Sequence, residues 1–526
     1  MPAIQNRHVV ALPRGNKEVF LSWRLLKTDP ANAAFFVEHM VNGTWRFPTD
    51  EAVVDATTIQ FPVDDSGPQQ FRIIAPDGTP SETATVDPTA EASLIARAHN
   101  LDPDARVQGV VIGDLQNNGR YGFVVRSAKG GTVWMTAIGM DGDRLWEIDT
   151  NLPERGGWDG SMHHVPFLAW DLNGDGRTEV AFHSFGGAYP KDTYDEAVDG
   201  ERFTVVDGET GDRVWETNWQ AIKSRVMMTV GHLDGIDEPA SVVVLDETYG
   251  DVTMTALNGV DGTVKWRVDQ ARGAGHNLDI GDIDEDGVQE VICGGICYNG
   301  DGSKRWEAEP FGHTDLSKPC RIDPSLPGMQ IWYAVEKENT GVYLVDKDGQ
   351  TQWKHPFKHA HYGWIARHAP GVDGLHPHTA EDSRRVEQDH YPVYLPDGST
   401  WLNLTDWQRK NFVPVHWDER PEVAFVIRKE DKRVVRLLAS GEIEDLTDSK
   451  LPETAEYGRN LGCVDVLGDA RENIVTVDPV HHQLLVLANP NRMSSRSLSP
   501  TESFEYRHDR SQLGSGYYIY LSPPIL

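Results

Sequence analysis

The chain is poor in basic residues and in cysteine, and it has no long apolar run. Its 526 residues include 49 lysines and arginines against 81 aspartates and glutamates, which gives a formal net charge of −32. Binding to nucleic acid needs a basic surface, so this charge balance argues against a nucleic-acid partner. No segment is apolar over the length that crosses a bilayer, so we expect no membrane span.

Several common signals are also missing. The first residues, MPAIQNRHVV, do not have the pattern of a signal peptide. No nucleophile elbow, phosphate-binding loop, HExxH motif or dinucleotide fingerprint occurs in a credible context, so cofactor-driven redox chemistry and phosphoryl transfer are not expected. The four cysteines, at 293, 297, 320 and 463, lack metal-ligand spacing with histidine. Disulfide bridges and buried free thiols both remain open.

Helical periodicity is nearly absent, whereas short β-rich segments and turn residues recur along the chain. In residues 1–88, strand-like segments at 19–26, 33–41 and 69–78 precede a polar segment that contains proline. This pattern predicts a small N-terminal β-sandwich of fibronectin type. The remaining residues, 89–526, form the second expected domain.

Residues 89–526 repeat two phrases. The first is an acidic, glycine-containing turn followed by a β-rich run, with eight copies at a spacing of roughly 40–60 residues. The second is a glycine turn that leads to Trp146, Trp215, Trp266, Trp306, Trp353 or Trp401. The spacing is that of four-stranded propeller blades, so we expect an eight-bladed β-propeller. We expect these tryptophans to pack between blades rather than to stack on sugar.

Two copies of the acidic phrase, DLNGDGRTE and DIDEDGVQE, carry oxygen ligands at alternate positions. Ca²⁺ prefers many oxygen ligands, and alternating acids around a glycine bend can surround one ion. The expected ligands are Asp171, Asn173, Asp175 and Glu179 in the first loop and Asp282, Asp284, Asp286 and Glu290 in the second. A solvated Asx turn is the alternative. Because the phrase recurs from blade to blade, we expect structural ions.

Histidines recur at equivalent positions beside these loops. They are His163, His164, His183, His276, His313 and His361. A propeller directs such positions toward its central channel, where imidazoles suit proton transfer and carboxylate binding near neutral pH. A single histidine of this kind is more often structural, but the repetition favours a functional cluster.

Tyr249 and Arg267 follow in the next repeat. A tyrosine can donate a proton to a leaving oxygen, and an arginine can hold a carboxylate through two hydrogen bonds. Each residue taken alone has a structural interpretation as well.

The order of these phrases resembles the rhamnogalacturonan lyases, a family with an eight-bladed, calcium-rich propeller and a small N-terminal β domain. The stretches that carry the resemblance include FLSWRLLKTDP, MHHVPFLAWDLNGDGRTEV, GAGHNLDIGDIDEDGVQEV and YLSPP, and they extend over nearly the whole chain. The resemblance implies cleavage of an acidic, rhamnose-containing polysaccharide by β-elimination, with Ca²⁺ bound and a 4,5-unsaturated uronate in the product.

The resemblance also implies site residues, with some departures. His276 and Asn277 resemble the site histidine of the family and its neighbour. Arg459 stands in for a family lysine, and Tyr362, beside His361, lies where the family has an arginine. These departures leave the substrate open.

A second resemblance concerns the residues around the first loop. His163 and His183, with Tyr249 and Arg267 beyond them, are similar to the sites of ulvan lyases and rhamnose–glucuronate lyases. It implies that Arg267 and His276 hold the uronate carboxylate, that His163 or His183 is the base, and that Tyr249 is the acid. The expected substrate-binding set is His164, Arg267, His276, Asn277, His361, Tyr362 and Arg459.

Two other functions remain open. A hydrolase related to propeller rhamnosidases would release products without unsaturation, and a carbohydrate-binding propeller would break no bond. Clustered histidines favour an enzyme. The substrate class and the use of calcium imply a secreted or periplasmic protein, and we expect a monomer that acts on an acidic polysaccharide or oligosaccharide.

Overall fold

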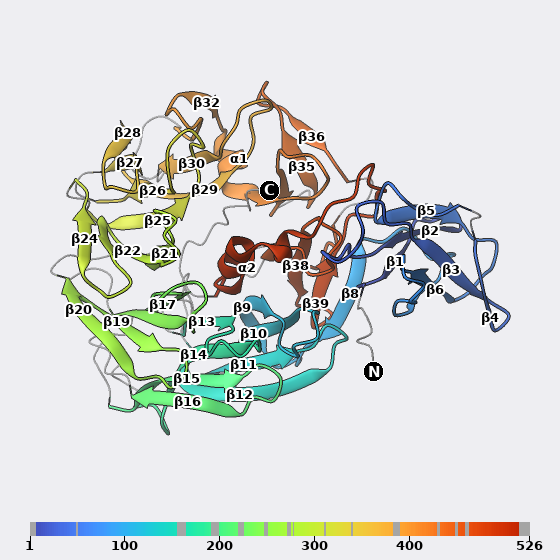
Figure 1. Cartoon of the computed structure of the whole chain (residues 1–526), viewed down its shortest axis with the longest axis horizontal. Helices are drawn as coiled ribbons and strands as arrows, with labels where there is room; N and C mark the ends of the chain where they lie inside the picture. Colours follow the sequence, from blue (N-terminus) through green and yellow to red (C-terminus); the bar gives the residue numbers. More distant parts are fainter. Residues whose placement is uncertain are drawn as a thin grey trace.

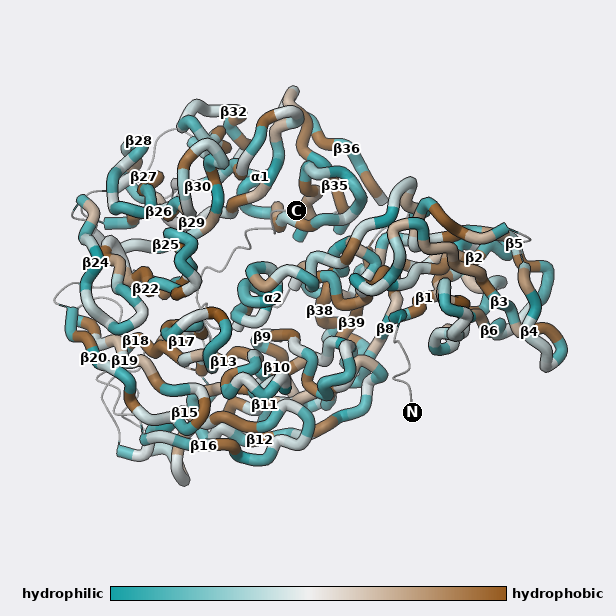
Figure 2. Tube along the Cα trace, viewed as in Figure 1, coloured by the Kyte–Doolittle hydropathy of each residue, from teal (hydrophilic) through white to brown (hydrophobic). Residues whose placement is uncertain are grey.

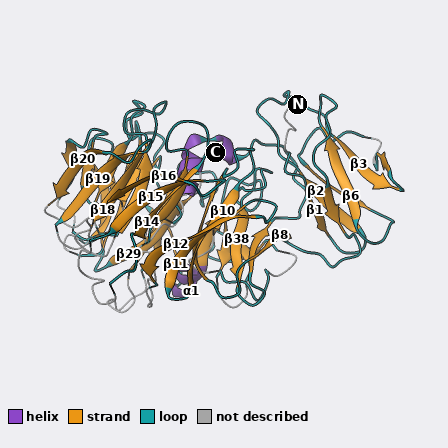
Figure 3. Ribbon diagram, turned by 90° about the horizontal axis from the view of Figure 1, so that it is seen from below, coloured by secondary structure: helices purple, strands orange, loops and turns teal. Residues whose placement is uncertain are grey.

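The computed structural model describes most of the chain, and almost all of that part consists of strands and turns. The described residues are 7–48, 51–154, 165–190, 199–218, 226–246, 251–270, 275–276, 278–309, 312–337, 340–381, 390–428, 432–447, 451–457 and 462–514, without the side chains of 361, 362 and 381. The helices in this part are α1 (Asp406–Asn411), α2 (Phe504–Ser511) and the 3₁₀ turn Pro500–Glu502. The prediction of an all-β fold is confirmed (Figure 3).

The N-terminal residues form two small sheets that lie beside the larger body (Figures 1 and 3). One sheet contains β1 (Val10–Pro13), β2 (Glu18–Ser22) and β5 (Thr58–Pro62), and the other contains β4 (Thr44–Arg46), β3 (Phe36–Val41), β6 (Gln69–Ile74) and β7 (Ala84–Val86). They share a core that includes Trp23, Phe35 and Phe71. All three side chains are fully buried.

Eight four-stranded antiparallel sheets follow, numbered here 1 to 8 in chain order. Sheet 1 contains β9 (Arg106–Gly113), β10 (Gly122–Lys129), β11 (Thr132–Ile138) and β12 (Arg144–Pro153), and sheet 2 contains β13 (Phe167–Trp170), β14 (Glu179–Phe185), β15 (Glu201–Asp207) and β16 (Arg213–Asn218). Sheet 3 contains β17 (Val226–Gly231), β18 (Ser241–Asp246), β19 (Val252–Asn258) and β20 (Val264–Gln270), and sheet 4 contains β21 (Leu278–Gly281), β22 (Glu290–Cys293), β23 (Ile296–Tyr298) and β24 (Lys304–Glu307).

The remaining four sheets have the same arrangement. Sheet 5 contains β25 (Thr314–Cys320), β26 (Gln330–Val335), β27 (Gly341–Val345) and β28 (Thr351–Pro356), and sheet 6 contains β29 (Ala360–Ala366), β30 (His376–Glu381), β31 (Pro392–Tyr394) and β32 (Thr400–Asn403). Sheet 7 contains β33 (Phe412–Val415), β34 (Ala424–Ile427), β35 (Val434–Leu437) and β36 (Ile443–Asp445). Sheet 8 joins β37 (Gly462–Val464), β38 (Asn473–Asp478) and β39 (Gln483–Leu487) to β8 (Ile95–Asn100), which comes before sheet 1 in the chain.

The sheets lie one after another around the middle of the molecule (Figure 1). Successive sheets share apolar cores, and one such core also joins sheet 8 to sheet 1 through residues such as Val477 and Phe123. In Figure 2 hydrophobic stretches follow strands such as β18 and β38. The burial of β17 and β18 along their whole length explains why these strands are apolar at nearly every position rather than at every second one.

Hydrogen bonds from five of the repeated tryptophans join one sheet to the next. The indole Nε1 of Trp146 donates a hydrogen bond to the carbonyl of Gly208 in the following sheet, at 2.9 Å. The same bond joins Trp215 to Gly259, Trp266 to Gly300, Trp306 to Lys347 and Trp353 to Pro396. At Gly262 (φ +71°) a Cβ would lie 2.5 Å from the ring of Trp215, so the turn needs glycine there. Packing between sheets is confirmed for these five tryptophans.

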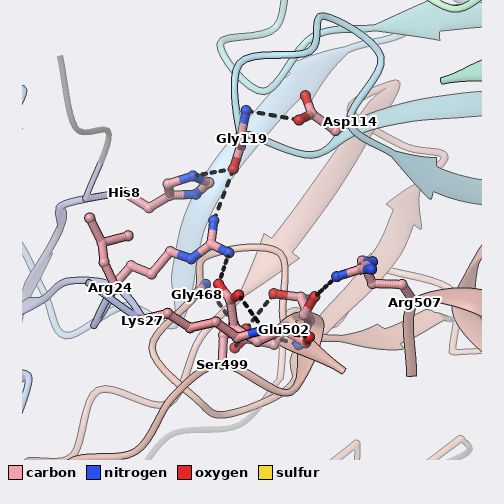
Figure 4. Close-up of polar contacts among 12 residues, drawn as sticks. His8, Arg24, Lys27, Asp114, Gly119, Gly468, Ser499, Glu502 and Arg507 are labelled. Atoms are coloured by element: carbon pink, nitrogen blue, oxygen red, sulfur yellow. Dashed lines mark hydrogen bonds and ion pairs between the residues drawn. The ribbon is translucent and has the colours of Figure 1, made fainter. Parts of the chain in front are cut away.

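Hydrogen bonds join the N-terminal sheets to the acidic turn between β9 and β10 (Figure 4). The ring Nε2 of His8 lies 2.9 Å from the carbonyl oxygen of Gly119, and Arg24 donates to the same oxygen at 3.1 Å. Arg24 also pairs with Glu502 at 2.6 Å. The ion pair between Arg24 and Glu502 joins the N-terminal sheets to a segment near the C-terminal end of the described chain.

The helix α2 lies in the middle of the sheets (Figure 1). Its Arg510 pairs with Glu472 of sheet 8 at 2.8 Å, and its Asp509 pairs with Lys318 of sheet 5 at 2.6 Å. The ring Nε2 of His508 lies 2.7 Å from the carbonyl oxygen of Val230 in sheet 3. A single short helix therefore links three sheets that are separate in the chain.

Two further observations concern the cysteines and the helices. All four cysteines are buried free thiols. Among the described residues, no helix has the length and apolar character to span a membrane.

Candidate functional site

The first acidic loop joins β13 to β14 and folds around its own acids. Both carboxylate oxygens of Asp171 accept backbone N–H groups of the loop, from Gly174 at 2.8 Å and Gly176 at 2.9 Å. The buried Glu179 accepts from the backbone of Leu172 at 2.8 Å. Burial, together with the charges of Asp171 and Asp175, raises the pKa of Glu179 to about 7. The loop concentrates negative charge that a cation would neutralise, and this fits a calcium site.

The second acidic loop, between β21 and β22, has the same form. Asp282 accepts from the backbone of Asp286 and Gly287, both at 3.0 Å, and Glu290 accepts from Ile283 at 3.0 Å. One carboxylate oxygen from each of Asp282, Asp284 and Glu290 lies within 4.8 Å of the others. These donors also fit a divalent cation, although Arg305 on β24 contacts two of them.

His183 lies on β14, and its side chain is 4% exposed. Its ring Nε2 lies 3.4 Å from Oε2 of Glu201, the first residue of β15, whose side chain is 3% exposed. The ring stacks on Phe203 at 5.5 Å between centroids. The imidazole therefore lies beside a carboxylate and against a phenyl ring, a setting that suits a base at a reacting centre.

A cavity of about 520 Å³ lies between sheets 2 and 3, in the ~300–1,000 Å³ range of small-molecule sites. Its polar lining consists of Asp199, Glu201, Thr217, Asn218, Asp246, Thr253, Thr255 and Arg267. The Arg267 side chain is 55% exposed, and within the described part of the chain its ion pair is a long one of 3.8 Å with Asp269. Its guanidinium can therefore turn to a ligand carboxylate. The cavity is thus lined both by Arg267 and by Glu201, the residue whose carboxylate contacts His183.

A buried group of histidines and acids lies at the starts of β21, β25 and β29. His276 and His313 meet edge to face at 4.6 Å, and Asp315 lies 3.8 Å from His276 and 3.6 Å from His313. Glu336 continues the group, at 3.4 Å from His313 and 3.1 Å from His359. Burial, with the charge of Glu336, raises the pKa of Asp315 well above its usual range.

This group has the donors of a metal site. One ligand atom from each of His276, His313 and Asp315 lies within 4.8 Å of the others. Two imidazoles and a carboxylate suit a divalent cation. Of the histidines at equivalent positions in the sequence, His276 and His313 thus lie side by side.

Several predicted site residues lie outside the described residues. They are His163, His164, Tyr249, Asn277 and Arg459, with the side chains of His361 and Tyr362.

Sequence reasoning missed four partners: Glu201, Asp315, Glu336 and His359. Asp315 follows His313 by two residues, so alternation on a strand could have placed both on one face. Glu201 lies 18 residues beyond His183 and carries no local signal.

Comparisons with known proteins agree with this architecture. A family model described as rhamnogalacturonan lyase family 11, C-terminal domain, matches residues 189–519. The rhamnogalacturonan endolyase YesW of Bacillus subtilis (strain 168) is 26% identical over 405 residues, covering 66% of this chain and 63% of the relative. The exolyase YesX of the same organism is 24% identical over 387 residues, covering 62% and 61%. The matched segments thus span less than two thirds of either relative.

Solved structures extend the likeness of fold over the whole chain. A rhamnogalacturonan lyase PL11 of Bacillus licheniformis superposes with a TM-score of 0.77 at 22% identity, covering 99% of this chain and 96% of that one. The exotype rhamnogalacturonan lyase YesX gives a TM-score of 0.79 at 19% identity, covering 99% and 95%. With a family model that matches well over half of its residues, the chain belongs to rhamnogalacturonan lyase family 11.

Proposed function

We propose that this protein is a polysaccharide lyase that cleaves a rhamnose- and uronate-containing polymer of the rhamnogalacturonan type by β-elimination. The observation that carries the proposal is a single cavity lined both by Arg267 and by Glu201, the partner of His183. A guanidinium in the cavity and an imidazole that contacts its lining are two of the groups that elimination next to a uronate carboxylate requires. The relatives named as rhamnogalacturonan lyases support the substrate class.

The roles follow from the chemistry. Arg267 pairs with the uronate carboxylate and so makes the C5 proton more acidic. His183 or His163 removes that proton, and the C4–C5 double bond forms as the C4–O4 bond breaks. Tyr249 supplies the proton that the departing O4 takes. The product carries a 4,5-unsaturated uronate. His164, Asn277, His361, Tyr362 and Arg459 are proposed substrate contacts.

Metal ions complete the proposal. Calcium bound at the loops 171–179 and 282–290 would stabilise the sheets, and a cation held by His276, His313 and Asp315 would supply positive charge to a substrate carboxylate. Glu336 and His359 orient His313 for that purpose.

The architecture belongs to the proposal as well. We propose that sheets 1 to 8 are the blades of one propeller, closed by β8 within sheet 8, with residues 1–88 as a separate N-terminal domain. The enzyme then acts as a monomer outside the cytoplasm on a polymer that cannot enter the cell.

The test is the ultraviolet absorbance of the conjugated unsaturated uronate, with calcium present. The panel is rhamnogalacturonan, ulvan and a rhamnose-capped glucuronate polymer. We expect the absorbance to rise on rhamnogalacturonan, because the relatives are lyases of that polymer. A rise on another polymer alone would confirm β-elimination but identify that polymer as the substrate. Released rhamnose without absorbance would mean hydrolysis, and binding without products would mean a carbohydrate-binding protein.

Asp315→Asn tests the buried metal group. The variant is expected to need at least about tenfold more divalent cation for half-maximal activity, because a ligand carboxylate becomes a neutral amide. The measurement is activity against cation concentration after chelation, with Asp348→Asn, an exposed carboxylate, as the matched control. An unchanged cation requirement would show that His276, His313 and Asp315 do not bind the cation that activity needs.

A further inference from the structure

The two strongest acidic loops differ in one neighbour that the sequence motif does not contain. In sheets 2, 3 and 4 the residue before the repeated tryptophan lies on the fourth strand of its sheet. This residue is Val214 in sheet 2, Lys265 in sheet 3 and Arg305 in sheet 4. The three positions are equivalent, because Trp215, Trp266 and Trp306 pair with the third strand in the same register.

In sheet 4 this residue is a cation that enters the acidic loop. The Arg305 guanidinium donates to Glu290 at 3.0 Å and forms a second, shorter contact with Asp284. Its side chain is 23% exposed, and that of Glu290 is 2% exposed. Arg305 thus contacts two of the three acids whose oxygens lie within 4.8 Å of one another.

The neighbouring sheets show the two alternatives. In sheet 3, Lys265 makes the corresponding contact with Asp234, in a loop that ends in Ser241 instead of an acid. In sheet 2 the position holds Val214, which is apolar and 41% exposed. Among the described residues, no lysine, arginine or histidine forms an ion pair with Asp171, Asp175 or Glu179, and Arg177 pairs with Asp207 and Glu209 instead.

We propose that Arg305 is a built-in counter-ion that makes the loop 282–290 a weak calcium site, whereas the loop 171–179 is the tight one. The inference rests on the calcium part of the proposed function. A divalent ion at Asp284 and Glu290 must displace the guanidinium and is repelled by it, since both seek the same oxygens. The calcium affinity of a loop therefore depends on the residue before the tryptophan as well as on the acidic motif.

The experiment counts calcium ions on the full chain by isothermal titration calorimetry after chelation, and follows thermal unfolding with and without calcium. Arg305→Gln is expected to bind calcium at one more site, or to bind at an existing weak site at least about tenfold more tightly. Its gain in unfolding temperature on adding calcium should exceed that of the wild type. Adding Asp284→Asn to this variant should abolish the gain, which assigns it to this loop.

Two variants provide matched controls. Lys265→Gln removes the same charge from sheet 3, where the closing acid is missing, and should create no new site. Val214→Arg places a guanidinium at the loop 171–179 and should weaken its calcium binding. Calcium binding by Arg305→Gln that equals the wild type in number and affinity would overturn the proposal.

Neither readout depends on lyase activity. If the protein is an active lyase but no variant binds calcium, both this inference and the structural role of calcium are wrong, whereas the proposed reaction still stands. An inactive protein that shows the expected calcium binding would leave the inference standing.

Discussion

His183→Ala is expected to slow formation of unsaturated product by about 10²–10⁴-fold, the usual loss when a general base is removed. The imidazole is held between Glu201 at 3.4 Å and the ring of Phe203. Glu201 in turn lines the cavity that contains Arg267. Alanine removes a buried ring beside the buried Glu201, so the unfolding temperature should fall, whereas circular dichroism at the assay temperature should match the wild type. The measurement is the initial rate of absorbance increase on the polymer that the panel identifies.

Two further variants sharpen this result. Glu201→Gln retains the shape of the side chain but removes its charge, so kcat should fall about tenfold with little change in KM, which marks a positioning residue. His481→Ala, at a histidine whose side chain is 61% exposed, should leave the rate unchanged. If His183→Ala is nearly fully active, His163→Ala becomes the deciding variant. Near-full activity in both would contradict the proposed mechanism.

Arg510→Met is expected to destabilise the protein by about 3–5 kcal/mol, the usual cost of leaving one charge of a buried pair alone. Arg510 and Glu472 lie 2.8 Å apart, and their side chains are 2% and 1% exposed. The hydroxyl of Tyr506 also donates to Glu472, at 3.0 Å. Methionine matches the aliphatic stem of arginine but leaves the Glu472 carboxylate without its counter-charge in the middle of the sheets.

The measurement for this variant is the urea midpoint of unfolding, compared with that of Arg507→Met. Arg507 lies on the same helix and donates one hydrogen bond, at 2.9 Å, to the backbone of Thr501, so its loss should cost about 1 kcal/mol. Equal midpoints for the two variants would show that α2 does not fasten the sheets. A loss confined to Arg510→Met would identify this helix as the link between sheets 3, 5 and 8.

Much of the fold is readable in the sequence because its signals are local. The acidic turns and the glycine–tryptophan phrases recur in order, and each encodes one turn or one contact with the next repeat. Trp146 and Trp215 therefore lie where the repeat predicted, each bonded to the following sheet. The acids of the loop 171–179 are close in the chain, so their convergence in space follows from their spacing alone.

The candidate site could not be predicted in the same way, because the partners of its histidines come from separate strands. Glu201 reaches His183 only through the pairing of β14 with β15, and Glu336 reaches His313 only because β25 and β26 are paired.

The all-β character of the chain and its repeated acidic and tryptophan phrases can be predicted from the sequence, since alternation and turn chemistry act over a few residues. Only the folded structure shows which carboxylates lie beside His183 and His313, that Arg305 contacts two acids of the loop 282–290, and that α2 joins distant sheets. These contacts depend on how whole sheets pack, and burial makes their charges count far more than exposed charges would.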